Sequence, residues 1–153
     1  MHSLALFISV SLVLAACKST ASDGGLARRM EIASAVLASV VDDTMASAAR
    51  IVYVSSTTVD PERIISALGA TKHIKLMPGA GEECQMSERR RIDSRSGLSC
   101  ALMRLDVVSV QEKSANVRYQ WNGPKGGVTI MTFSLEERSG RWIIVGRRVN
   151  LAS

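Results

Sequence analysis

The sequence predicts an α+β domain in which N-terminal helices pack on a curved antiparallel sheet. Residues 26–50 carry apolar side chains at spacings of three to five, as a helix does, whereas residues 99–150 divide into four β-rich segments separated by short turns. The chain has 153 residues, and we place one domain with its own hydrophobic core at residues 26–153.

The first predicted helix, from Leu26 to about Arg50, carries its apolar residues on one face. These residues are Leu26, Met30, Ala33, Leu37, Val40, Met45, Ala48 and Val52. The pair Asp42-Asp43 marks a place where the helix can break. A helix lying on a membrane is the alternative, but such helices carry basic residues on one face and bulky aromatic residues on the other. The alanine-rich composition favours packing against the domain's own sheet.

Three short elements are expected between this helix and the β-rich part. Ile51–Val54 is β-branched and aromatic, and predicts either a strand or the last turn of the helix. Asp60 is a good N-cap before proline, so a helix is expected over Pro61–Leu68, closed by Gly69. His73–Met77 predicts a short strand, because a Pro-Gly pair follows it.

The C-terminal part predicts a meander of four antiparallel strands. Their ranges are Ser99–Gln111, Ala115–Trp121, Val128–Glu136 and Arg141–Asn150. The connections "EKS", "NGPKGG" and "RSG" are too short for parallel crossovers.

The pattern of side chains in this meander predicts an uneven sheet. One face is expected to carry Leu105, Val107, Val117, Tyr119, Trp121, Val128 and Ile130. The other face begins polar and becomes apolar, with Arg104, Asp106, Arg118 and Gln120 followed by Met131, Phe133, Leu135, Trp142 and Ile144. Strong twist, a bulge that switches face, or a helix on one side and a partner on the other would explain this.

The helix and the meander ending in "LEERSGRWIIVG" resemble the NTF2-like folds, whose last hairpin often carries a Gly-Arg-Trp turn. The resemblance covers Leu26–Val149 in layout and Ser139–Val145 in residues. A cystatin-like or other helix-on-sheet layout fits as well. The NTF2-like family includes isomerases, dehydratases and non-catalytic binding or assembly modules, so the fold does not decide the function.

Residues 3–16 are uncharged and largely apolar. The stretch is shorter than the roughly 20 residues that span a bilayer and ends in small residues, so residues 1–16 predict a signal peptide. A buried core helix is the alternative, but the segment is not amphipathic. The tetrad Leu14-Ala15-Ala16-Cys17 resembles the lipobox of bacterial lipoproteins, which implies that Cys17 receives a diacylglycerol and becomes the first mature residue.

Residues 17–25 combine this cysteine with the small, polar segment "KSTASDGG", which predicts a flexible tether. Such a tether has a root-mean-square span of roughly 16 Å, so the domain is expected to lie close to the membrane. Lys18 stands where some lipoproteins carry the Asp that retains them in the inner membrane. By this resemblance, the outer membrane is favoured over the inner.

The chain has three cysteines, an odd number for an exported protein. Acylation of Cys17 leaves the pair Cys84 and Cys100, in a compartment where disulfides persist. A bridge between them closes a loop of about 15 residues and contributes roughly 3 kcal/mol. Two inert buried thiols are the alternative.

Catalytic candidates are few. Once residues 1–16 are removed, His73 is the only histidine, so a histidine general base must be this residue. Its place in a strand between lysines favours an ordinary surface histidine. The adjacent acids Asp42-Asp43 and Glu82-Glu83 do not point at one substrate atom on a helix. The sequence has no cysteine and histidine spacing that suits zinc, no calcium-binding loop and no phosphate-binding glycine motif. It therefore implies no cofactor.

The densest charge cluster, "SERRRIDSR", lies between Cys84 and Cys100. Its arginines are Arg89, Arg90, Arg91 and Arg95. A guanidinium group can bind a carboxylate or a phosphate through two parallel hydrogen bonds. A solvated loop pinned by the disulfide is the simpler interpretation. Three interpretations are open for Trp121 and Trp142. They can line a ligand pocket, anchor a partner, or belong to the core.

Two function classes remain. The first is a lipoprotein, anchored in the membrane through Cys17, whose non-enzymatic domain binds another envelope protein. The second is a small-ligand binder or hydrolase with an NTF2-like pocket. The formal charge of +5 is dispersed along the chain, and nucleic acid is not expected as a partner in the envelope. Because no acid, base and nucleophile set is recognisable, the first class is favoured.

Overall fold

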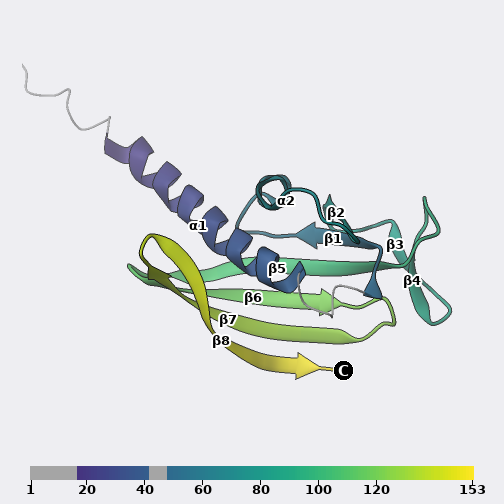
Figure 1. Cartoon of the computed structure of the whole chain (residues 1–153). Coiled ribbons are helices and arrows are strands. Elements are labelled where there is room, and N and C mark those ends of the chain that lie inside the picture. Colours follow the sequence, from purple (N-terminus) through teal and green to yellow (C-terminus); the bar gives the residue numbers. More distant parts are fainter. Residues whose placement is uncertain (1–16, 42–47) are drawn as a thin grey trace, which may run out of the picture.

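The computed structural model describes residues 17–41 and 48–153 and has two helices beside a mostly antiparallel six-stranded sheet (Figure 1). The strand order is β2-β1-β5-β6-β7-β8, and β3 and β4 form a separate hairpin. The elements are α1 (Cys17–Val41), β1 (Ile51–Ser55), α2 (Pro61–Leu68), β2 (Lys75–Pro78), β3 (Cys84–Ser87), β4 (Arg90–Asp93), β5 (Cys100–Val110), β6 (Ser114–Asn122), β7 (Val128–Arg138) and β8 (Arg141–Ala152). The α+β class is confirmed.

The C-terminal end of α1 differs from the prediction. The helix ends at Val41 instead of near Arg50. Arg50 belongs to the sheet, because its N–H donates to the Ser99 carbonyl (3.0 Å) and its own carbonyl accepts from the Lys75 N–H (2.8 Å). The break expected at residues 42–43 lies outside the described residues.

The N-terminal end of α1 differs as well. The helix begins at Cys17 instead of Leu26, so residues 17–25, expected as a flexible tether, have a helical backbone. The helix continues through the adjacent residues Gly24 and Gly25, although glycine disfavours a helix. Within the described residues, neither helix has the length and apolarity needed to cross a bilayer.

The prediction for α2 is confirmed at both ends. The Asp60 carboxylate accepts a hydrogen bond from the Glu62 N–H (3.0 Å), and Pro61 occupies the first turn. Gly69, at φ +78°, donates its N–H to the Ile65 carbonyl and closes the helix.

The sheet is not wholly antiparallel. Residues 51–54, left open between strand and helix, form part of β1, which runs parallel to both β2 and β5. The connection from β1 to β2 through α2 is a crossover, and crossovers join parallel strands. The strands from β5 to β8 form the predicted antiparallel meander.

The register between β6 and β7 overturns the expected uneven sheet. Tyr119 lies opposite Met131 and Val117 opposite Phe133, whereas Ile130 lies opposite Gln120. Because a shift of one residue moves every side chain of a strand to the other face, the apolar residues of β7 join those of β5 and β6. One face is therefore largely apolar from β5 to β7.

The helices cover this apolar face (Figure 1). α1 packs on β5, β6, β8 and α2, and its residues at helical spacing are buried: Ile32, Ala33, Val36, Leu37 and Val40. The buried residues of the sheet include Val52, Val54, Met103, Leu105, Val107, Val117, Tyr119, Trp121, Phe133 and Leu135. Arg28 fastens the start of the packed part by bonding to Glu137 (2.8 Å) and the Glu112 carbonyl.

Candidate functional site

The side of the sheet turned away from α1 carries a row of polar side chains across four strands. Asp106 of β5 lies opposite Arg118 of β6. Thr132 of β7 lies between Arg118 on one side and Arg148 of β8 on the other. We call this surface the open face, and it also includes Arg104, Asn116, Gln120, Ser134 and Asn150.

The arginines of the open face differ in what they bind. Arg104 Nε donates to Asp106 Oδ2 at 2.6 Å. Arg118 and Arg148 are exposed, and within the described residues neither side chain forms a hydrogen bond or an ion pair. The open face therefore presents two cations whose charge no carboxylate of the described chain neutralises directly.

The Asp106 carboxylate is already engaged on its other oxygen. Asp106 Oδ1 accepts from the Thr57 N–H (2.8 Å) and the Thr57 hydroxyl (2.9 Å), which fastens the loop after β1 to β5. Burial raises the pKa of Asp106, but the hydrogen bonds from Thr57 and Arg104 outweigh it and hold this pKa below its usual value. Asp106 is therefore ionised, occupied and a weak base.

Two hollows lie on the open face. The smaller, of about 140 Å³, is lined by Arg104, Asp106, Arg118 and Gln120. The larger, of about 860 Å³, begins at Arg118 and extends across β7 to Arg148 and Leu151. Arg118 borders both hollows, so it is placed to contact anything that lies along the row.

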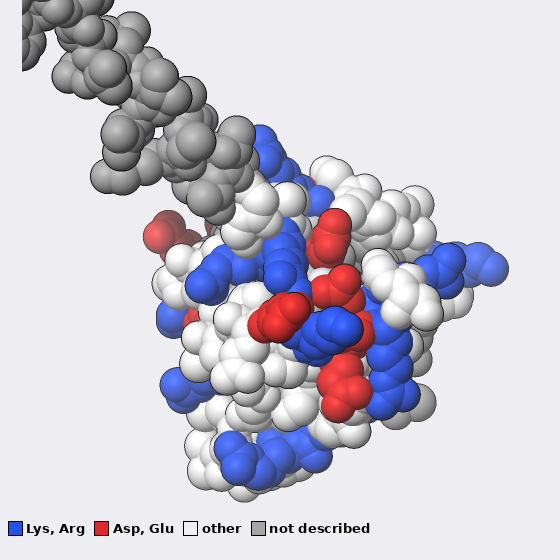
Figure 2. Space-filling view, turned by 90° about the vertical axis from the view of Figure 1, so that its left-hand side faces the viewer, with Lys and Arg blue, Asp and Glu red and all other residues white. Residues whose placement is uncertain are grey.

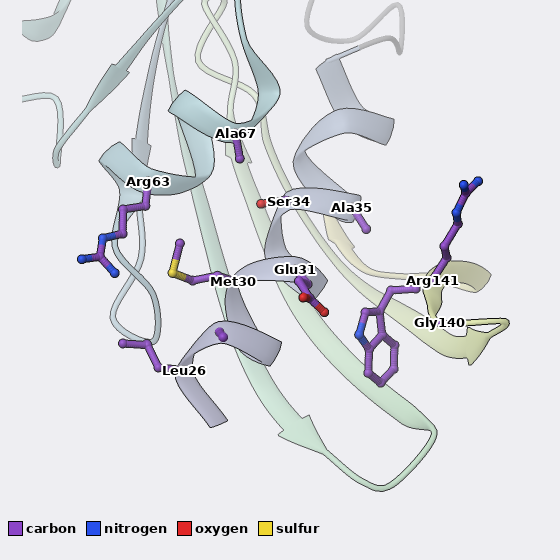
Figure 3. A pocket seen from close by; sticks show the side chains of 11 residues that line it. Leu26, Met30, Glu31, Ser34, Ala35, Arg63, Ala67, Gly140 and Arg141 are labelled. Carbon is purple, nitrogen blue, oxygen red and sulfur yellow. The ribbon is translucent and has the colours of Figure 1, made fainter. Parts of the chain in front are cut away.

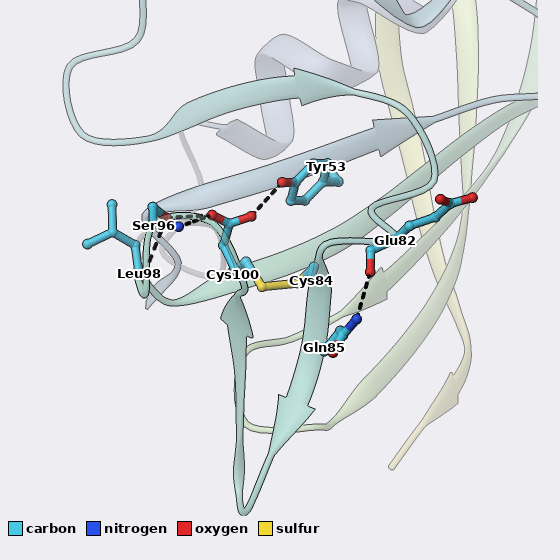
Figure 4. Close-up of a disulfide and its surroundings, with 8 residues drawn as sticks. Tyr53, Glu82, Cys84, Gln85, Ser96, Leu98 and Cys100 are labelled. Carbon is cyan, nitrogen blue, oxygen red and sulfur yellow. Dashed lines mark hydrogen bonds between the residues drawn. A yellow bond between two sulfur atoms is a disulfide. The ribbon is translucent and has the colours of Figure 1, made fainter.

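The β3–β4 hairpin lies at the end of the sheet where β5 begins, next to a second, small cluster of buried residues (Figure 4). The predicted disulfide is confirmed, since Cys84 at the start of β3 is bonded to Cys100 at the start of β5, with their Cα atoms 5.9 Å apart. Beneath the bridge the hairpin buries Ile51 and Tyr53. The disulfide therefore joins the hairpin to β5 of the sheet.

A buried carboxylate stabilises the base of this hairpin (Figure 4). Asp93 is 3% exposed and accepts hydrogen bonds from the Tyr53 hydroxyl (2.6 Å), the Ser96 hydroxyl (2.6 Å) and the Ser96 N–H (2.8 Å). The hydrogen bonds from Ser96 and Tyr53 hold the pKa of Asp93 below its usual value. The arrangement fixes the turn that follows β4.

The four arginines singled out in the sequence do not converge. Their segment is a hairpin instead of the expected loop, with Arg89 in its turn and both Arg90 and Arg91 on β4. Arg95 follows β4 and pairs with Glu83 (2.5 Å). The Arg91 N–H donates to the Pro124 carbonyl (2.7 Å), so the hairpin is also held against the turn between β6 and β7.

His73 lies just before β2 and is exposed. It lines a hollow of about 500 Å³ together with Arg50, Lys72 and Lys75, and no carboxylate or cysteine lines that hollow among the described residues. The hydroxyl of the nearby Thr71 is bonded to the Ile74 carbonyl. His73 therefore has no nucleophile or orienting acid beside it in the described part of the chain.

The two tryptophans have different places. Trp121 is 5% exposed and belongs to the core. Trp142 is half-buried at the edge of the core, where the Arg28 guanidinium lies 5.2 Å from its ring centre.

Trp142 also lines a groove of about 720 Å³ over the outer side of α1 (Figure 3). The groove is largely apolar, with Leu26 and Met30 among its lining residues, and Figure 3 shows the side chains of Arg63 and Arg141 extending outward to either side. Glu31 and Ser34 also line the groove, and the two arginine side chains do not converge with them.

Charges are mixed at the end of the molecule from which α1 starts. Figure 2 shows basic and acidic side chains alternating there, and ion pairs join Arg28 to Glu137 and Arg138 to Glu136. This end has no large surface of a single sign in that view, in contrast to the free arginines of the open face.

Comparisons with known proteins give no relative. No protein-family model, curated protein or solved structure matches the chain. Within the described residues, no group of three or more His, Cys, Asp and Glu side chains is placed to hold a metal ion. The function must therefore be inferred from the surfaces described above.

The sequence reasoning placed Arg104 and Arg118 on a polar face but missed Arg148. The signal was available in the last strand, where Gly146, Arg148 and Asn150 alternate with other side chains as a solvent-facing set. The bulges in β8 interrupt that alternation, because they shift its pairing with β7 between Ile130 and Met131 and between Ser134 and Leu135.

Proposed function

We propose that this protein is a lipid-anchored lipoprotein of the bacterial envelope whose folded domain is a non-enzymatic module for binding another envelope protein. In this proposal residues 1–16 are the signal peptide and Cys17 carries the lipid. Lys18, in place of a retention-signal aspartate, favours the outer membrane.

We propose that the open face is the binding surface and that it receives an acidic segment of the partner. The observation that carries this proposal is the pair of free cations Arg118 and Arg148 on either side of Thr132. Two strand spacings separate them, about 10 Å, which suits carboxylates on one extended segment. Guanidinium–carboxylate contacts are among the stronger hydrogen bonds in proteins.

The fold resemblance supports this function only in outline. A long helix crossing a meander fits the cystatin-like layout more closely than the cone of the NTF2-like folds, because the groove of about 720 Å³ lies over α1 and outside the core. The parallel unit of β1, α2 and β2 was part of neither expectation. We therefore propose a helix-on-sheet layout and base the function on the open face.

A small anionic ligand is the second candidate. The hollow of about 140 Å³ favours it, because Arg104, Arg118 and Gln120 converge there. A hydrolytic version of this candidate has little support, since the Asp106 carboxylate in the same hollow is occupied and has a lowered pKa.

The lipid anchor is tested by the intact mass of protein extracted from membranes. We expect a chain beginning at Cys17 with a diacylglycerol added, and we expect Cys17→Ser to give an uncleaved or soluble product. An unmodified Cys17 thiol in the extracted protein would contradict the anchor.

The binding surface is tested by a photo-crosslinking amino acid introduced in cells at Gln120, on the open face, and at His73 as a control away from it. We expect one discrete crosslinked polypeptide from position 120 that weakens when Arg118→Gln and Arg148→Gln are added. Equal amounts of crosslinked product from both positions would exclude the open face as the binding surface. A product whose amount is unchanged by the two arginine substitutions would exclude it as well.

A further inference from the structure

The two edges of the sheet are protected to different degrees. β2, at one edge, has four residues and ends in Pro78. β8, at the other edge, has twelve residues and, within the described chain, pairs with β7 on one side only. A long edge strand leaves a row of backbone N–H and C=O groups able to pair with another strand.

The C-terminal end of β8 shows which backbone groups face outward. Val128 and Ser153 exchange both of their backbone hydrogen bonds, each 3.0 Å long. In an antiparallel ladder the next residue along, Ala152, then turns its N–H and C=O away from β7. The outward groups of β8 are therefore directed at the place where a seventh strand would lie.

The side chains of β8 also leave apolar surface at this edge. Four of the large apolar residues that are exposed in the described chain belong to this strand: Ile143 (42%), Val145 (45%), Val149 (59%) and Leu151 (49%). Concentrated exposure of this kind marks an interaction surface.

Grooves flank the edge on both sides. On the helix side a hollow of about 560 Å³ lies between α1 and β8 and is lined by residues such as Ala35 and Val145. On the other side the larger hollow of the open face reaches Arg148 and Leu151. An added strand sends successive side chains to opposite faces, so it would fill both grooves in alternation.

Charge decides which strand suits this edge. β8 contains Arg141, Arg147 and Arg148 and no acidic residue. Pairing two copies of β8 would bring all of their arginines to one seam, and like charges placed opposite each other destabilise a sheet. Arg147 already binds Ser39 Oγ (2.7 Å) and covers the Phe133 ring, which leaves Arg148 and Arg141 for a partner.

We propose that β8 accepts an extended acidic segment of a protein partner as a seventh, edge strand of the sheet. This rests on the proposed protein-binding function and gives the manner of binding. The bulges in β8 divide the edge into short regular stretches, so the added segment is short and pairing with unrelated strands is limited.

The test uses the full-length protein in mild detergent and a capped eight-residue peptide that alternates valine with glutamate. Hydrogen–deuterium exchange is followed by mass spectrometry. We expect slower exchange at residues 141–152 and no change at β2, and we expect a peptide alternating valine with lysine to have no effect. No slowing at β8 with millimolar peptide would overturn the proposal.

Matched variants locate the contact. Val149→Asp, at an exposed position of the edge, is expected to weaken binding about tenfold. Leu98→Asp, which places the same charge at a 48% exposed position away from β8, is expected to leave binding unchanged. Equal effects of the two variants would show that the edge is not the contact.

Other outcomes separate this inference from the proposed function. Peptide binding that protects β5 and β6 but not β8 would overturn the edge strand and leave the open face standing. Protection of β8 from exchange that is unchanged by Arg118→Gln, a change on β6, would support the edge strand and remove the open face. If exchange at β8 slows without peptide as the protein concentration is raised, a second copy of the chain occupies the edge. That result would overturn the proposal of an acidic partner.

Discussion

The phenolic hydroxyl of Tyr53 donates a 2.6 Å hydrogen bond to the carboxylate of Asp93. Tyr53 lies on β1 inside the sheet, and Asp93 ends β4 in the separate β3–β4 hairpin. The pair therefore joins two parts of the fold that the disulfide joins a second time. The hydrogen bond to Asp93, burial, and the nearby negative charge raise the pKa of Tyr53 to about 12.

This pair predicts how stability depends on pH. The pKa of Asp93 is lowered in the folded state, so its contribution is present above the unfolded value of about 4 and is lost as pH falls through the folded value. The pKa of Tyr53 is raised, so its contribution is complete below about pH 10 and is lost as pH rises through about 12. Thermal unfolding across pH should show both losses.

Tyr53→Phe isolates the hydrogen bond from the packing of the ring. We expect the variant to lose roughly 1.5 to 3 kcal/mol at neutral pH, because the ionised carboxylate of Asp93 keeps its bonds to Ser96 and loses one donor. The alkaline loss of stability that Tyr53 causes should also disappear. A variant that is as stable as the parent at pH 7 and loses stability at alkaline pH to the same extent would contradict a stabilising hydrogen bond between Tyr53 and Asp93.

Removal of the disulfide should loosen the hairpin more than the sheet. The bridge closes a loop whose ends are 16 positions apart, so replacing both Cys84 and Cys100 by Ala should cost roughly 3 kcal/mol. Denaturant unfolding gives the loss. Hydrogen exchange should rise first at residues 84–93, and a uniform rise over the whole sheet would disagree with a local role.

Gly81 and Gly140 form a matched pair for a backbone test. Both have φ +73°, but a Cβ at Gly81 would overlap the side chains of Leu102 and Tyr53, whereas nothing lies within 4 Å of a Cβ at Gly140. Gly140→Ala should cost about 1 kcal/mol from strain alone. Gly81→Ala should cost about 1 to 3 kcal/mol more because a packed site must shift. Equal melting temperatures would argue against close packing at Gly81.

The two tryptophans should respond differently to truncation. Trp121→Ala removes a core side chain that is 5% exposed and should cost about 3 to 5 kcal/mol. Trp142→Ala should cost less, since this ring is half-buried beside Arg28. Urea midpoints measured in parallel compare them, and the reverse order would mean that Trp142 supports the core more than its exposure indicates.

The sequence predicted those parts of the fold that depend on nearby residues. The bounds of α2 followed from Asp60 and Gly69, because a helix cap acts within one turn. The parallel neighbours of β1 were missed because pairing between distant strands leaves no local pattern. The register of β7 was missed because the turn over residues 123–127 allows two alternatives that differ by one position, and that difference exchanges the faces.

The candidate site was harder to predict for a related reason. An arginine is free only if no carboxylate comes near it in space, and the sequence does not contain that information for Arg118 or Arg148. The prediction of a partner-binding site therefore selected arginines that are close together in the chain, between Arg89 and Arg95. The structure distributes those residues along a hairpin, where Arg95 is paired.

The parallel placement of β1 between β2 and β5 has a consequence for how the chain reaches this fold. The meander from β5 to β8 forms from strands that are neighbours in the chain, whereas β1 pairs with β2 on one side and on the other with β5, which begins only at Cys100. Contacts between distant segments form late because long loops must close first. During synthesis Ile51–Ser55, which is almost wholly buried in the finished sheet, emerges well before β5. In that interval one side of this apolar segment has no partner strand and is open to pairing with other proteins.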